Sequence, residues 1–112
     1  MELETEQIEG VLIGRLKGRL DASTSDTIQE SLLKTIDEGN TQLALDLAGL
    51  EYISSAGLRV LLMTHKKVSQ SQGKLIIFGL QDYIHEILEI AGFTAILTLS
   101  ENQESALSEL SS

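Results

Sequence analysis

Residues 47–61 read Leu47-Ala-Gly-Leu-Glu-Tyr-Ile-Ser-Ser-Ala-Gly-Leu-Arg-Val-Leu61 and join a predicted strand to a predicted helix. The predicted strand ends at Leu47 and has Leu43, Leu45 and Leu47 on one face, and the helical pattern begins at Ser54 and Ser55. Unpaired backbone N–H groups and the helix dipole stabilise negative charge at a helix N-terminus. The pattern therefore suits a reversibly phosphorylated serine, and it also suits a serine that only caps the helix.

Strand and helix patterns alternate along the rest of the chain. We expect strands at residues 1–8, 11–17, 42–47, 74–78 and 95–99. We expect helices from a cap at residues 23–25 to about 38, from 55 to 72, from 81 to 91, and from a capping box at Ser100 and Gln103 to about 110. This alternation predicts a mixed sheet with parallel strand pairs, because the helical segments are long enough for crossover connections. Pattern alone leaves the strand order open.

Composition limits the class of protein. The 112 residues contain no Pro, no linker and no internal repeat, so we expect a single domain over residues 1–112. With no Cys and two His, a disulfide framework, thiolate chemistry and a zinc site are not expected. No apolar run approaches the ~20 residues of a membrane span, and the acidic start is unlike a secretory signal. We therefore expect a cytoplasmic protein without direct membrane insertion.

The net charge of −9 bears on the partner. It argues against nucleic acid or an anionic membrane as the main partner. It gives weak support to a partner with a basic surface.

The predicted helix from residue 55 has two distinct faces at 3.6 residues per turn. The face expected in the core carries Leu58, Leu61, Leu62, His65 and Val68. The opposite face carries Ala56, Val60, Met63 and Lys67, with Arg59, Lys66 and Gln70 beside them. Isolated apolar side chains on a surface are common. Val60 and Met63 also fit a docking stripe beside Ser55, since Met suits a surface that repacks around a partner.

Two motifs carry a family resemblance. Tyr52-Ile-Ser-Ser-Ala-Gly-Leu-Arg-Val60 resembles the phosphorylation-site signature of the STAS domain, in the branch of bacterial anti-sigma factor antagonists. Upstream, Gly18-Arg-Leu-Asp-Ala-Ser-Thr24 resembles that family's Gly-x-Leu-Asp-x-x-Thr segment. The order of elements fits along nearly the whole chain. The resemblance implies an α/β fold with a mixed sheet of about four to five strands and about four helices packed mainly on one side.

The resemblance also implies a function. It implies a non-enzymatic protein that binds an anti-sigma factor with serine kinase activity and so frees a sigma factor to regulate transcription. The family's phosphate acceptor corresponds to Ser55, with Ser54 as the alternative, and a metal-dependent serine phosphatase would reverse the modification. Family members often carry Asp at the position of Ser54 and Gly at that of Arg59, so this chain departs from the pattern at both.

Helix face and resemblance together predict a partner-binding surface. It comprises Asp21, Thr24, Ser54, Ser55, Ala56, Arg59, Val60, Met63 and Lys67. Turn and cap chemistry explains Asp21 and Thr24 equally well. We also expect Tyr52 to pack under the loop.

Two other classes of function compete with this interpretation. An enzyme would need Ser55 paired with His65 or His85 as a base, but His65 lies nearly three helical turns away. No nucleophile elbow or phosphate-binding glycine loop is present. We therefore expect neither catalysis nor a cofactor. The second class is a STAS scaffold subunit of a signalling assembly or of a transport system, without sigma-factor output.

Overall fold

A five-stranded sheet forms the centre of the computed structural model, which describes residues 1–111. Its strands are β1 (Glu4–Ile8), β2 (Val11–Arg15), β4 (Gln42–Asp46), β6 (Lys74–Phe78) and β7 (Thr98–Ser100), in the order β1-β2-β4-β6-β7. β1 runs antiparallel to β2, and the other pairs are parallel. A second, two-stranded parallel sheet pairs β3 (Gly18–Leu20) with β5 (Leu50–Ile53).

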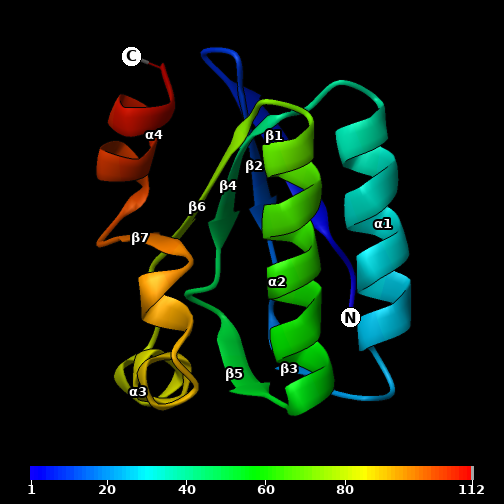
Figure 1. Ribbon diagram of the computed structural model, residues 1–112, viewed down its shortest axis with the longest axis vertical. Helices are drawn as coiled ribbons and strands as arrows, with labels where there is room; N and C mark the ends of the chain where they lie inside the picture. The colour runs from blue at the N-terminus through cyan, green and yellow to red at the C-terminus, as the bar shows by residue number, and fades with distance from the viewer. Residues whose placement is uncertain (112) are drawn as a thin grey trace.

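Within residues 1–111, four α-helices pack around the two sheets (Figure 1). They are α1 (Ser25–Asp37), α2 (Ser55–Gln70), α3 (Asp82–Ile90) and α4 (Gln103–Ser111), and a short 3₁₀ helix, η1 (Phe93–Ala95), follows α3. Figure 1 shows α1 and α2 side by side along one face of the sheet. The predicted α/β class, with its mixed sheet and its four helices, is confirmed. None of the helices within residues 1–111 is both long and apolar enough to cross a bilayer.

The sheet separates two hydrophobic cores. Leu43 and Leu45 of β4 point into the larger core, which α1, α2 and α3 also line. Ala44, between them in sequence, points to the opposite face, where it packs with Ala106 and Leu110 of α4. This alternation follows from the two-residue period of a strand. In the described part of the chain, residues 1–111, three α-helices therefore contribute to one core and α4 covers the other face, which agrees with the expectation that the helices pack mainly on one side.

Three local predictions differ from the structure. The short strands β3 and β5 were not predicted, and η1 occupies part of the expected strand 95–99, so β7 begins only at Thr98. Gly92, at φ +80°, redirects the chain into η1. At the start of α4 the capping acceptor is Asn102, whose Oδ1 accepts from the Ser105 amide at 2.9 Å, and not Ser100.

Candidate functional site

Ser54 and Ser55 lie where β5 ends and α2 begins. The Oγ of Ser54 accepts a hydrogen bond from the Gly57 amide at 3.3 Å, which confirms Ser54 as the N-cap. Ser55 is exposed at the first helical position, and none of the side-chain hydrogen bonds found within residues 1–111 uses its hydroxyl. The two serines thus have different roles, with one held by the helix and the other open to solvent.

The first turn of α2 is held tightly against the end of β3. A Cβ added at Gly57 would lie 2.7 Å from the Leu20 carbonyl oxygen and 2.7 Å from Cγ1 of Ile53. The Ser54 amide donates to the same Leu20 oxygen at 3.0 Å. Glycine is required here because any side chain would push the helix away from the strand. Ser55 is therefore presented on a fixed piece of backbone.

The loop after Leu20 brings Asp21 and Thr24 beside this turn. The Asp21 carboxylate accepts from the Ser23 hydroxyl at 2.7 Å and from the Ser23 amide at 3.0 Å. These hydrogen bonds hold the pKa of the Asp21 carboxyl below its ordinary value of 3.8. The Thr24 hydroxyl accepts from the Asp21 amide at 3.0 Å and donates to the Arg19 carbonyl at 2.9 Å. Both side chains therefore build the turn that lies next to Ser54.

Arg19 is a candidate residue that the sequence analysis did not select. Its guanidinium carbon lies 4.1 Å from the ring centroid of Tyr52, and its Nε lies 3.7 Å from Oδ2 of Asp21. The pairing of β3 with β5 sets Arg19 opposite Tyr52. The expectation that Tyr52 packs under the loop is wrong, since it is 38% exposed and stacks with this cation. Only the unpredicted short sheet could have indicated the contact.

Val60 does not belong to the exposed face of α2. It is fully buried, so its predicted place in an exposed docking stripe is wrong. The buried face of α2 is formed by Gly57, Val60, Leu61, Thr64 and Val68. Leu58, Leu62 and His65, which were expected in the core, are only half-buried.

The difference between the predicted and the observed buried face of α2 has a physical reason. Gly57 sits where α2 comes close to Leu20 and Ile53, and the buried Thr64 satisfies its hydroxyl by donating to the Val60 carbonyl at 2.8 Å. Leu61 and Val68 are buried as expected, but a pattern based on large apolar residues misses Gly57 and Thr64 and shifts the predicted core face away from Val60.

The exposed face of α2 retains most of the predicted surface. Ser55, Arg59 and Met63 are exposed at successive four-residue steps, and Met63 is 40% exposed. Ala56 is half-buried. Lys67 is also half-buried, and its Nζ lies 3.1 Å from Oδ1 of Asp37 on α1. With Val60 removed, Met63 is the apolar member of the predicted stripe that solvent reaches.

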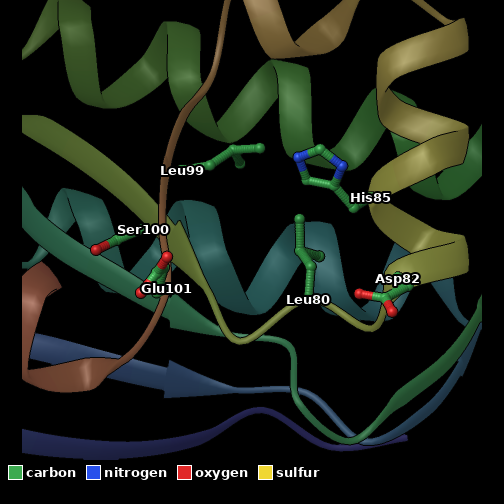
Figure 2. Close-up of a pocket in the computed structure, with 6 residues that line it drawn as sticks. All are labelled: Leu80, Asp82, His85, Leu99, Ser100 and Glu101. Atoms are coloured by element: carbon green, nitrogen blue, oxygen red, sulfur yellow. The ribbon is translucent and has the colours of Figure 1, made fainter.

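A separate hollow of about 460 Å³ lies where β7 ends and α3 begins (Figure 2). Its lining residues are Leu80, Asp82, His85, Leu99, Ser100 and Glu101. The His85 ring points into the space above Leu80, and its Nδ1 lies 3.8 Å from Glu89 Oε2. Ser55 is not among the lining residues, so this hollow does not pair the serine with His85. No cluster of His, Asp and Glu in residues 1–111 is placed to hold a metal ion.

Relatives of known name match almost the full length. The chain is 37% identical over 106 residues to BtrV of Bordetella bronchiseptica, named as a candidate anti-sigma factor antagonist, covering 95% of this chain and 91% of BtrV. It is 32% identical over 111 residues to the anti-sigma F factor antagonist of Paenibacillus polymyxa, covering 98% of this chain and 95% of that protein.

Solved structures share the fold. A candidate anti-sigma factor antagonist from Thermotoga maritima matches with a TM-score of 0.92 at 17% identity, over 96% of this chain and 93% of that one. The Bacillus cell fate determinant SpoIIAA in its phosphorylated form matches with a TM-score of 0.73 at 17% identity, over 96% and 98%. The family model for the STAS domain matches residues 2–106. With this match spanning nearly every element described above, the chain belongs to the STAS domain family.

Proposed function

We propose that this chain is an anti-sigma factor antagonist that acts as a phosphorylation-controlled partner switch. It binds an anti-sigma factor that has serine kinase activity, and a sigma factor is thereby released to direct transcription. The protein performs no catalysis of its own, acts in the cytoplasm as one domain over residues 1–112, and is returned to the binding form by a metal-dependent serine phosphatase. The observation that carries this proposal is the exposed hydroxyl of Ser55 at the N-terminus of α2.

The position of Ser55 suits a phosphate that changes binding without unfolding the protein. A phosphoserine adds about −1.5 to −2 charges near neutral pH. The N-terminus of α2 tolerates that charge because its unpaired N–H groups and dipole face it. Arg59 lies one turn along the same face, within the reach of an i, i+4 pair. The fold therefore persists while the surface acquires a bulky, hydrated anion.

Loss of binding follows from desolvation. A partner that packs on Met63 and Ala56 would have to cover the phosphate or leave water around it. Covering an unpaired dianion costs several kcal/mol, which exceeds the contribution of a typical surface contact. The hydrogen-bonded turn at Asp21 and Thr24 gives this surface a fixed edge next to Ser54. Val60 contributes only from inside the core.

The proposal is tested with protein purified from its native cells. Intact mass and site mapping, before and after phosphatase treatment, should find one phosphate on Ser55. Titration calorimetry against the kinase partner should then show that Ser55→Asp binds at least tenfold more weakly than wild type, whereas Ser55→Ala binds normally. Ser108→Asp is the matched control for an added carboxylate, since Ser108 is exposed on α4, on the opposite face of the sheet. A Ser55→Asp variant that binds as tightly as wild type contradicts the switch, and a protein never phosphorylated favours a scaffold role.

A further inference from the structure

Helix α2 is distinctive in its charge. The chain contains 17 Asp and Glu residues against 8 Lys and Arg. None of the acidic residues lies on α2, which carries Arg59, Lys66 and Lys67. A cationic helix on a protein of net charge −9 forms a local positive field on an otherwise negative surface.

The C-terminal half of α2 borders a groove shared with α1. Its lining residues are Leu33, Met63, Lys66, Lys67 and Gln70, and its volume is about 270 Å³. Leu33 and Met63 form its apolar wall, one half-buried and the other 40% exposed. The nearby Asp37 is already paired with Lys67 at 3.1 Å. Lys66 is exposed and makes no ion pair within residues 1–111.

We propose that this groove, hereafter the α1/α2 groove, binds an acidic amphipathic helix of a partner protein. One apolar side chain of the partner fits between Leu33 and Met63, and the flanking carboxylates meet Lys66 and Lys67. Charge selects this occupant, since a basic segment would meet Lys66 and Lys67, and the Asp37 carboxylate beside Lys67 is already engaged in an ion pair. The flexible thioether of Met63 can repack around the inserted side chain. This mode of binding is that of a helix in a groove.

The α1/α2 groove extends the proposed function by giving the partner a second contact, which shares Met63 with the switch surface and continues toward the C-terminus of α2. Lys66 follows Ser55 by 11 residues, which is about 16 Å along a helix that rises 1.5 Å per residue. The Debye length is about 8 Å at physiological salt, so a phosphate on Ser55 is largely screened at Lys66. The inference rests on the proposed function in one respect, namely that a partner protein binds along α2. Binding at the groove should therefore be indifferent to phosphorylation.

The test uses two fluorescein-labelled synthetic helical peptides with Leu on one face and either Glu or Lys on both flanks. Fluorescence anisotropy at 0.15 M salt should show that the wild-type protein binds the Glu peptide and not the Lys peptide. Lys66→Glu should weaken binding by about fivefold, the upper range for one surface charge pair. Lys17→Glu is the matched control, since Lys17 is exposed, has its Nζ 3.9 Å from Oε2 of Glu4, and does not line the groove. It should change binding by less than about twofold.

The location of binding is read from backbone amide shifts. Addition of the Glu peptide should shift the amides of Leu33, Met63 and Gln70 more than that of Ser55. Equal binding of the Lys peptide, equal weakening by Lys17→Glu, or shifts confined to other elements would overturn the inference. Sedimentation of the protein alone supplies another decisive outcome. A dimer that Lys66→Glu dissociates would mean that a second copy covers the groove, which also overturns it.

The two proposals fail separately. Ser55→Asp should bind the Glu peptide as wild type does, because Lys66, which meets the carboxylates of the peptide, lies about 16 Å from Ser55 along α2. If Ser55→Asp still binds the kinase partner fully, the proposed switch is wrong while the groove result stands. If the Glu peptide does not bind but Ser55→Asp loses the kinase partner, the groove is wrong and the switch stands. Circular dichroism of Lys66→Glu and Lys17→Glu verifies that both variants are folded.

Discussion

Gly57→Ala should destabilise the protein, although alanine normally favours a helix. Ala is up to about 1 kcal/mol better than Gly within a helix. At this position, however, the new Cβ would meet the Leu20 carbonyl oxygen at 2.7 Å and Ile53 Cγ1 at 2.7 Å. One of these atoms belongs to the backbone of β3, so it cannot rotate away. Helix propensity alone would make Gly57→Ala stabilising, whereas the steric clash makes it destabilising. The sign of the change in the free energy of unfolding therefore tests how closely α2 packs against β3.

The size of the effect follows from three contributions. Forcing an extra methyl into a packed site typically costs about 1–3 kcal/mol. Moving the Leu20 oxygen also weakens its hydrogen bond with the Ser54 amide, now 3.0 Å long, at a cost of about 1 kcal/mol. The helix propensity of Ala offsets about 1 kcal/mol of this. We expect a net loss of about 1–3 kcal/mol, and about 4 °C in Tm per kcal/mol for a chain of this length.

Urea denaturation of Gly57→Ala, wild type and Ala56→Gly measures the effect. Ala56→Gly is the control, because it reports the helix propensity of the same turn without adding an atom. Hydrogen exchange of the Ser54 amide should quicken in Gly57→Ala, since that amide donates to the displaced oxygen. If Gly57→Ala is as stable as wild type or more stable, α2 does not rest on Leu20 as described, and the fixed presentation of Ser55 loses its basis.

Three further predictions follow from the same contacts. Ser54→Ala should lower the free energy of unfolding in urea by about 0.5–1 kcal/mol, the low end for an N-cap, because its hydrogen bond is 3.3 Å long; no loss would mean that the cap is not formed. Val60→Ala should cost about 1–3 kcal/mol, whereas Met63→Ala should stay within about 0.5 kcal/mol; the reverse order would restore Val60 to the surface. NMR titration should place the Asp21 pKa below 3.8 and show it rising in Ser23→Ala. Because the folded-state pKa is lowered, the stability contributed by Asp21 is present above pH 3.8 and is lost as the pH falls through the folded-state pKa; an unchanged Asp21 titration in Ser23→Ala would contradict that hydrogen bond.

Periodicity in the sequence predicted the elements that bury long runs of apolar residues. β6 was located by its continuous apolar run, and β4 and the helices α1 to α3 were located within a few residues because their apolar positions repeat with the period of a strand or a helix. The strands β3 and β5 were not predicted, because three or four residues are too few to show a period. Their pairing joins residues 32 or 33 positions apart in sequence, such as Arg19 and Tyr52, which no local pattern reports.

The candidate site was predictable in outline for a related reason. The motif indicated Ser55, and cap chemistry indicated Ser54, because both depend on local sequence. Arg19 and its contact with Tyr52 depend on the pairing of β3 with β5 and were therefore missed. Val60 was misplaced because a hydrophobicity pattern weights large side chains, whereas the closest contact of α2 is made by Gly57.

The burial of Val60 bears on how the proposed switch would operate. If Val60 had been exposed, partner binding and the stability of α2 would share a residue, and either could change the other. Instead Val60 and Gly57 hold α2 from beneath, while Ser55 and Met63 occupy its open side. A charge added at Ser55 then meets a helix whose buried contacts it does not touch. The proposed regulation is therefore a change in the chemistry of one face, made on a scaffold that need not move.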